Sequence, residues 1–163
     1  MRGKKAPKHK LKPDIRYGNV YVTKFINYVM RAGKKSVAQK VVYGAFDIID
    51  KAIKDKKVDA EFENALQVFD QAIKNISPQI EVRGKRVGGA NYQVPFPVRG
   101  DRKYALAFRW IIDAADKKKG RSMAAKLADE LMLALIGEGD SVKKKNDVHR
   151  MADANRAFAH FAR

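Results

Sequence analysis

The chain has 163 residues, of which 45% are hydrophobic and none is cysteine. This length and composition predict one domain with its own hydrophobic core, and they exclude disulfides, thiolate metal sites and thiol catalysis. Lysine and arginine number 35 against 18 acidic residues, a formal net charge of +17, which favours a polyanionic partner.

The charge is unevenly distributed along the chain. Between Ala45 and Asp70 seven acids outnumber four lysines, so this segment carries −3 within a strongly cationic protein. We therefore expect one surface to face a polyanion and another to face solvent or protein. A membrane partner is not expected, because no apolar run could span a bilayer and the first residues lack the apolar core of a signal peptide. The expected location is the cytoplasm or its organellar equivalent.

Residues 1–18 are predicted to form a basic, extended N-terminal arm. Its cations, with no acid before Asp14, are Arg2, Lys4, Lys5, Lys8, Lys10 and Lys12. Repulsion between like charges keeps such a segment from folding alone. A solubilising tail is the simpler interpretation, but the charge of the whole chain favours an arm that binds phosphates and becomes ordered on contact.

Residues 19–163 are predicted to form a helical domain. Apolar residues at helical spacing predict helices from about Asn19 to Gly33, from about Ser36 to Lys54, and from an N-cap at Asp59 to just before Pro78. The second pattern places Val37 on the inward face. The loop between the first two helices, residues 33–35, is short and cationic.

Residues 79–98 interrupt the helical pattern. Apolar and polar residues alternate on both sides of Gly88 and Gly89, which predicts the two strands of a hairpin. Pro95 and Pro97 share parity, so both missing N–H groups fall on the outer edge. Because a lone two-stranded hairpin is marginal in water, we favour a protruding arm completed by an anionic partner over a hairpin lying on the surface.

Three further helices are predicted after the ribbon. Asp101 caps the first, which ends in a cationic turn at residues 117–121, and Ser122 begins the second. The last begins at about Asn146, after the lysine triplet at 143–145. The predicted fold is mainly α: a single-domain bundle of about six helices with a protruding two-stranded β-ribbon between the third and fourth helices.

The last helix combines an apolar stripe with basic and polar residues. The stripe, which we assign to the core, contains Val148, Met151, Ala154, Phe158 and Phe161. His149 and Arg156 share a second face, where they suit contacts to phosphates and unpaired bases, although a solvated face is an equally good interpretation. The only tryptophan, Trp110, is assigned to the core rather than to a stacking platform.

Catalytic and metal-binding motifs are missing from the sequence. There is no phosphate-cradling GxxxxGK[ST] loop, no HExxH and no nucleophile elbow, and the last two of the three histidines, His149 and His160, lie too far apart along a helix to share a metal ion. We therefore expect neither enzymatic activity nor a cofactor or metal.

Four segments together resemble a known family. They are Pro13–Gly18 (PDIRYG), Phe25–Lys35 (FINYVMRAGKK), Arg86–Pro95 (RVGGANYQVP) and Lys143–Phe161 (KKKNDVHRMADANRAFAHF). They closely resemble the seventh protein of the small ribosomal subunit in its bacterial form. The matching segments run from about residue 8 to the end of the chain, in the order that the family shows.

The resemblance implies a structural constituent of the small ribosomal subunit. Family members bind the 3′ major (head) domain of small-subunit rRNA directly and nucleate assembly of the head. Their ribbon and C-terminal region approach the tRNA in the exit site. They also contact neighbouring head proteins and a platform protein, for which the acidic segment at residues 45–70 is a candidate surface here.

Two sets of candidate residues follow from the charge pattern and the resemblance. For rRNA we expect contacts from Arg2, Lys4, Lys5, Lys8, Lys10, Lys12, Lys34, Lys35, Arg83, Arg99, Arg102, Lys118, Lys119 and Arg121. For tRNA we expect contacts from Lys85, Arg86, Val87, Gly88, Gly89, His149, Arg150, Asn155 and Arg156. The alternative is a DNA-architectural protein, because a basic ribbon with an apolar residue near its tip can also enter a minor groove.

Overall fold

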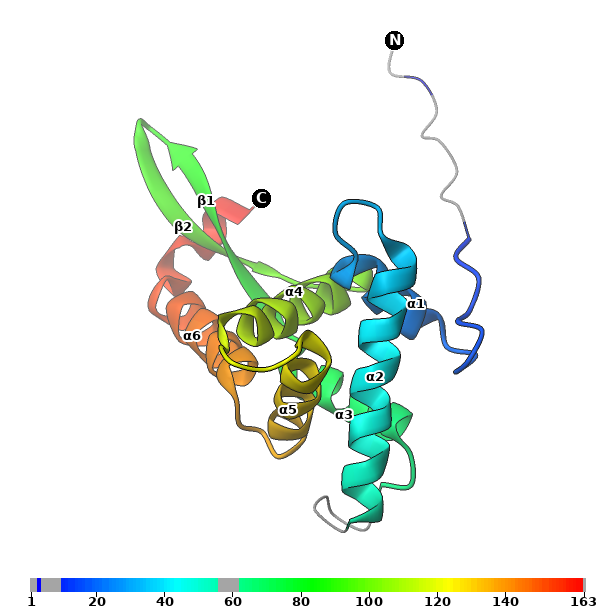
Figure 1. The fold of residues 1–163 in the computed structure, drawn as a ribbon. Helices are drawn as coiled ribbons and strands as arrows, with labels where there is room; N and C mark the ends of the chain where they lie inside the picture. The colour runs from blue at the N-terminus through cyan, green and yellow to red at the C-terminus, as the bar shows by residue number, and fades with distance from the viewer. Residues whose placement is uncertain (1–2, 4–9, 56–61, 163) are drawn as a thin grey trace.

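The computed structural model describes residues 3, 10–55 and 62–162. Within them lie six α-helices, one 3₁₀ helix and one hairpin, in the predicted order (Figure 1). The elements are α1 (Val20–Val29), α2 (Lys35–Lys54), α3 (Ala65–Ile76), β1 (Ile80–Val87), β2 (Ala90–Pro97), α4 (Asp101–Lys117), α5 (Met123–Leu135), α6 (Asp140–Ala154) and the 3₁₀ helix η1 (Arg156–Ala162). The mainly helical fold with a ribbon between the third and fourth helices is confirmed.

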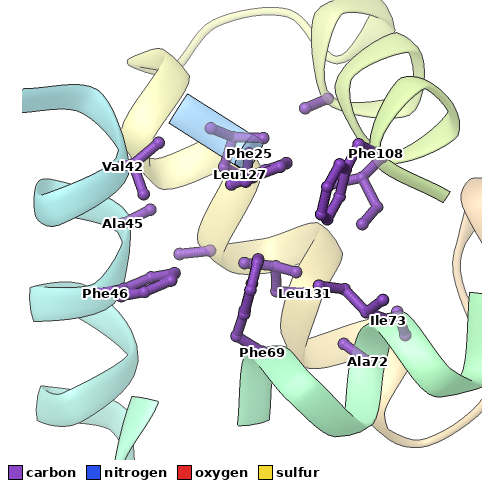
Figure 2. Packing of buried hydrophobic residues seen from close by; sticks show 14 of the residues in the cluster. Phe25, Val42, Ala45, Phe46, Phe69, Ala72, Ile73, Phe108, Leu127 and Leu131 are labelled. Atoms are coloured by element: carbon purple, nitrogen blue, oxygen red, sulfur yellow. The ribbon is translucent and has the colours of Figure 1, made fainter. Parts of the chain in front are cut away.

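Helix α5 contacts α2, α3, α4 and α6, so it lies at the centre of the bundle (Figure 1). The core beside it is built around one aromatic ring from each of four helices (Figure 2). The Phe69 ring centroid lies 5.3 Å from those of both Phe25 and Phe46 and 6.3 Å from that of Phe108. Each such pair contributes about 0.5–1.5 kcal/mol beyond the area that it buries. Among the described residues, no helix is long and apolar enough to cross a membrane.

Several helix boundaries differ from the predicted ones. Helix α1 ends at Val29 instead of Gly33, because Met30 is already extended (ψ 130°); the chain then turns through left-handed conformations at Ala32 and Gly33 (φ 49° and 72°). The predicted cap Asp59 lies outside the described residues, and α3 begins only at Ala65. There the Asp50 carboxylate of α2 accepts a hydrogen bond from the Ala65 amide at 2.8 Å, so the third helix is capped from another helix.

Two smaller assignments near helix starts are also wrong. Asp101 is the first residue of α4 and not its cap, which is Gly100. Val37 in the first turn of α2 is 53% exposed, whereas its neighbour Ala38 is buried. By contrast, Ser122 caps α5 as predicted, since its hydroxyl accepts from the Ala125 amide.

Helix α6 begins at Asp140, so the lysine triplet at 143–145 lies inside the helix and not in a loop. The inward face of α6 also differs from the predicted one: Val142 and Ala152 are buried, whereas Met151 is 48% exposed. The helix also ends at Ala154, and the last two phenylalanines continue in the 3₁₀ helix. The predicted continuous apolar stripe on α6 is therefore wrong. Trp110 does pack against the core, as predicted.

The ribbon has the predicted two-residue turn and edge. Gly88 and Gly89 have φ values of 57° and 89°, as a type I′ turn requires. The Val98 amide donates to the Gln79 carbonyl at 2.8 Å, and the hydrogen-bonded pairs alternate from there along the register. The two prolines of β2 therefore occupy outward-facing positions, which confirms their assignment to an outer edge.

Candidate nucleic-acid interface

A buried carboxylate lies at the base of the ribbon. Glu81 is only 6% exposed and accepts from Arg102 Nε and Nη2 at 3.1 and 2.9 Å, while its other oxygen pairs with Arg83. The Arg83 guanidinium also lies over the Phe96 ring, 5.3 Å from its centroid. Two of the predicted rRNA-binding arginines are thus held by one acid, and the cluster keeps a net positive charge.

The distal half of the ribbon is supported by the C-terminal segment. The Tyr92 ring lies 5.0 Å from Phe158 and 5.5 Å from Phe161, centroid to centroid. The Lys85 ammonium donates to the Phe161 carbonyl at 2.7 Å. The ribbon therefore has more to pack against than the sequence suggested, and the two segments predicted to face tRNA form one continuous surface. At the tip, Arg86 and the turn glycines are exposed.

His149 connects α6 to the start of the ribbon. Its Nε2 accepts from the Gln79 amide at 3.2 Å. Burial and the nearby Lys145 ammonium lower the pKa of His149, against an opposing effect of Asp153. A neutral imidazole that accepts through Nε2 carries its proton on Nδ1, which is the atom left for the predicted tRNA contact.

The other predicted tRNA-binding residues at the C-terminus have different environments. Arg150 is exposed and pairs with Asp147 at 2.8 Å, one turn earlier on α6. Asn155 is half-buried at the C-cap of α6, and Arg156 is exposed at the start of η1. Of these three, Arg156 alone presents an exposed cation without a partner among the residues that the structure describes.

The loop between α1 and α2 presents two lysines without acidic partners. Lys34 and Lys35 are exposed, and neither side chain forms a hydrogen bond or ion pair within the described part of the chain. Lys35 is also the first residue of α2, whose first turn holds no acid. The partial positive charge at the N-terminus of a helix adds to that of the lysines. This loop is the clearest concentration of unneutralised positive charge among the described residues.

The loop between α4 and α5 is held by a second buried carboxylate. Glu130 is fully buried; it accepts from the Ser141 amide and hydroxyl at 3.0 and 2.8 Å, and Lys118 Nζ lies 2.7 Å from its other oxygen. Burial acts to raise the pKa of Glu130, but Lys118 and Ser141 outweigh it and hold that pKa below its ordinary value. Arg121 pairs with Asp129 at 2.8 Å, so in this loop Lys119 alone is an exposed cation without an acid.

The end of the N-terminal arm is anchored on the helices. Asp14 is 7% exposed and accepts from the Arg16 and Tyr17 amides and from the Tyr43 hydroxyl, while Thr23 Oγ1 donates to the Lys12 carbonyl at 3.0 Å. Of the six predicted cations in the arm, two are described and exposed, at positions 10 and 12. The other four, at positions 2, 4, 5 and 8, lie outside the described residues. The division of the chain at residue 18 stays a prediction.

The acidic and basic segments point in different directions. In Figure 1 the ribbon tip and the loop between α1 and α2 lie toward the upper side of the molecule, while the C-terminal end of α2 points away from them. Asp47 and Asp50 lie on that C-terminal half of α2 together with Lys51 and Lys54, and Asp55 is its C-cap, so this end is close to neutral. This end of α2 therefore carries less positive charge than the loop between α1 and α2. Arg99, two residues after β2, is exposed.

The chain is similar to known proteins over nearly its whole length. A family model described as ribosomal protein S7p/S5e matches residues 1–156. The chain is 52% identical over 161 residues to small ribosomal subunit protein uS7 of Thermotoga neapolitana, with 99% of each chain covered. It is 54% identical over 159 residues to the uS7 protein of Prosthecochloris aestuarii, with 98% of each covered. The chain belongs to the ribosomal protein S7p/S5e family, which is a family of ribosomal structural proteins and not of enzymes.

Proposed function

We propose that this protein binds the 3′ major domain of small-subunit rRNA, nucleates assembly of the head of the small subunit, and contacts tRNA in the exit site. Family membership and the names of the full-length relatives support a place in the small ribosomal subunit. We therefore expect the protein in the cytoplasm, or in the matching compartment of an organelle.

The pair Lys34 and Lys35 carries the rRNA-binding part of the proposal. Exposed lysines that have no acidic partner release counterions when they meet phosphates, and this release drives binding to a polyanion. An α-helix or ribbon cannot read the narrow major groove of A-form RNA, so recognition depends on the shape of a folded junction. A rigid helical bundle with cationic loops suits such recognition.

The joined ribbon and C-terminal segment support the tRNA contact. Arg86 at the tip and Arg156 at the start of η1 are exposed, and the Tyr92 cluster packs the two segments together. The two turn glycines carry no side chain, so a nucleic-acid backbone can approach closely there. The segment at residues 45–70, which carries a net −3 in this cationic chain, is the candidate surface for neighbouring head proteins and a platform protein.

A salt-dependent binding experiment tests the rRNA assignment. Affinity for a head-domain rRNA fragment is measured at several salt concentrations, with duplex DNA as competitor. The double variant Lys34→Ala/Lys35→Ala should reduce the slope of log affinity against log salt by about two units. Lys51→Ala/Lys54→Ala removes the same charge from the far end of α2 and should leave the slope nearly unchanged.

Two results would contradict the assignment. An equal change of slope for both double variants would mean that the loop is not the site of phosphate contact. Displacement of the rRNA fragment by duplex DNA at comparable concentration and salt would favour the DNA-architectural alternative, in which the ribbon enters a minor groove.

A further inference from the structure

We propose that a pocket between α1 and α4 binds an unpaired base of the bound RNA. The pocket has a volume of about 260 Å³ and is lined by Tyr28 and Asn27 of α1, Tyr104 and Phe108 of α4, and Leu11 of the N-terminal arm. Drug-sized ligands occupy pockets of about 300–1,000 Å³, so this one suits a single planar ring system. The inference rests on the proposed RNA-binding function and adds a site to it.

Aromatic rings form the floor and two walls of the pocket. Phe108, at the floor, is 1% exposed, and the centroids of Tyr28 and Tyr104 lie 5.6 and 6.5 Å from that of Phe108. Tyr21 continues the row, 4.4 Å from Tyr104. A base that enters the pocket therefore meets aromatic side chains whose positions are already fixed by packing against the core.

One aromatic wall, Tyr28, is exposed, and the other, Tyr104, is half-buried. Tyr28 is 37% exposed, whereas the phenylalanine that it covers is buried. Leu11 is 41% exposed at the rim, and the hydrogen bond between Thr23 and the Lys12 carbonyl holds this part of the arm on α1. Packing within the chain therefore leaves part of the apolar surface of this pocket exposed to solvent. A flat aromatic ligand would cover that surface.

A polar group in the pocket can read the edge of a base. The Asn27 side chain lines the pocket and forms no hydrogen bond within the described part of the chain. Its amide offers both a donor and an acceptor, which matches the mixed edge of a nucleobase. An apolar side chain of a protein partner would leave this amide unpaired.

The charge around the pocket favours a nucleotide over a protein side chain. Arg109 lies over the Tyr28 ring, 5.9 Å from its centroid, and Lys24 lines the pocket. Lys10 and Lys12, on either side of Leu11 in the sequence, are exposed. The one acid in the lining, at position 101, pairs with Lys24 at 2.8 Å. A base in the pocket would thus hold its phosphates beside several cations.

Two variants of Tyr28 test the stacking. Tyr28→Leu keeps an apolar contact with Phe108 but removes the ring face, and it should weaken binding of the head-domain rRNA fragment by about 5- to 150-fold. The salt slope should stay unchanged, because no phosphate contact is lost. Tyr28→Phe keeps the ring and should restore most of the lost affinity. Ile136→Ala, an exposed apolar residue at the end of α5, is the control and should bind normally.

Ultraviolet crosslinking to a short single-stranded oligouridine locates the base independently of the rRNA. We expect the crosslinked nucleotide on the peptides that carry Tyr28 or Tyr104, and crosslinks only elsewhere would overturn the pocket. Tyr28→Leu affinity within twofold of the wild type, or a salt slope changed by one unit, would also overturn it. If the pocket crosslinks but the wild-type protein does not bind the rRNA fragment, the proposed function fails while the pocket stands.

Discussion

The buried carboxylate of Glu130 joins three elements, and its removal has a calculable cost. It accepts from the amide and hydroxyl of Ser141 at the start of α6, and it pairs with Lys118 from the loop after α4. Glu130→Ala leaves two buried donors of Ser141 without an acceptor, at about 1–3 kcal/mol each. The Lys118 side chain is 27% exposed and can return to water, so it adds less. We expect a total of about 3–5 kcal/mol.

Glu130→Gln separates the hydrogen bonds from the charge. The glutamine carbonyl can still accept from Ser141, while the charge that pairs with Lys118 is lost, so we expect a cost of about 1–2 kcal/mol. Urea unfolding followed by far-ultraviolet circular dichroism at neutral pH measures both variants. Glu138→Ala, an exposed acid at the same corner, is the control and should cost less than about 0.5 kcal/mol. An alanine variant within about 1 kcal/mol of the wild type would refute the reasoning.

The pH dependence gives a second, independent check on Glu130. Its pKa in the folded protein lies below the ordinary value of 4.5, so the stability it contributes is present above pH 4.5 and is lost as the pH falls through the lower folded pKa. Glutamine does not titrate. The difference in unfolding free energy between wild type and Glu130→Gln should therefore become smaller as the pH falls. A constant difference from neutral pH to pH 3 would show that the charge of Glu130 does not stabilise the folded protein.

Two further predictions concern backbone crowding and the ribbon tip. In Gly139→Ala the new Cβ would lie 2.8 Å from Glu130 Oε1 at a φ of 96°, whereas in Gly137→Ala it would meet nothing within 4 Å at a φ of 81°. Gly139→Ala should lower the midpoint of urea unfolding clearly more than Gly137→Ala does. Equal midpoints would show that crowding against Glu130 does not destabilise the Gly139 variant. Arg86→Glu should weaken exit-site tRNA binding by reconstituted subunits without changing rRNA affinity or helicity, and normal tRNA binding would exclude a contact at the tip.

Local patterns predicted most of the fold, and contacts distant in sequence explain what they missed. Periodicity identified the helices, and the glycine pair with alternating flanks identified the ribbon. The start of α3 depends on Asp50 and the start of α6 on Glu130, which lie 15 and 11 residues before the amides that they cap. Propensity rules for helix starts consider neighbouring residues only, so they placed one start too early and the other too late.

The sequence predicted which lysines and arginines belong to the candidate interface. It did not predict which of them form ion pairs with acids of the same chain. Charge counting and the family resemblance identified the lysines and arginines, whereas Glu81 and Glu130 determine which of them are held by acids. Glu130 did leave a signal: it lies three residues after Leu127 and four before Ala134, on the buried stripe of α5. A charged residue on an apolar stripe is uncommon unless it is paired, and it points to a partner elsewhere in the chain.

The pairing leaves the interface with two kinds of cation that should act differently. Arg102 is oriented by Glu81 through two of its five N–H donors, so its remaining donors are positioned before RNA binds and less rotamer entropy is lost. Lys34 and Lys35 have no such partner and lose more entropy on binding, but no acid within the described residues offsets their charge, so they neutralise phosphates and release counterions more fully than Arg102 does. The salt dependence of binding should therefore reflect mainly the free lysines, while discrimination between correct and incorrect RNA shapes depends on the cations that the fold holds in place.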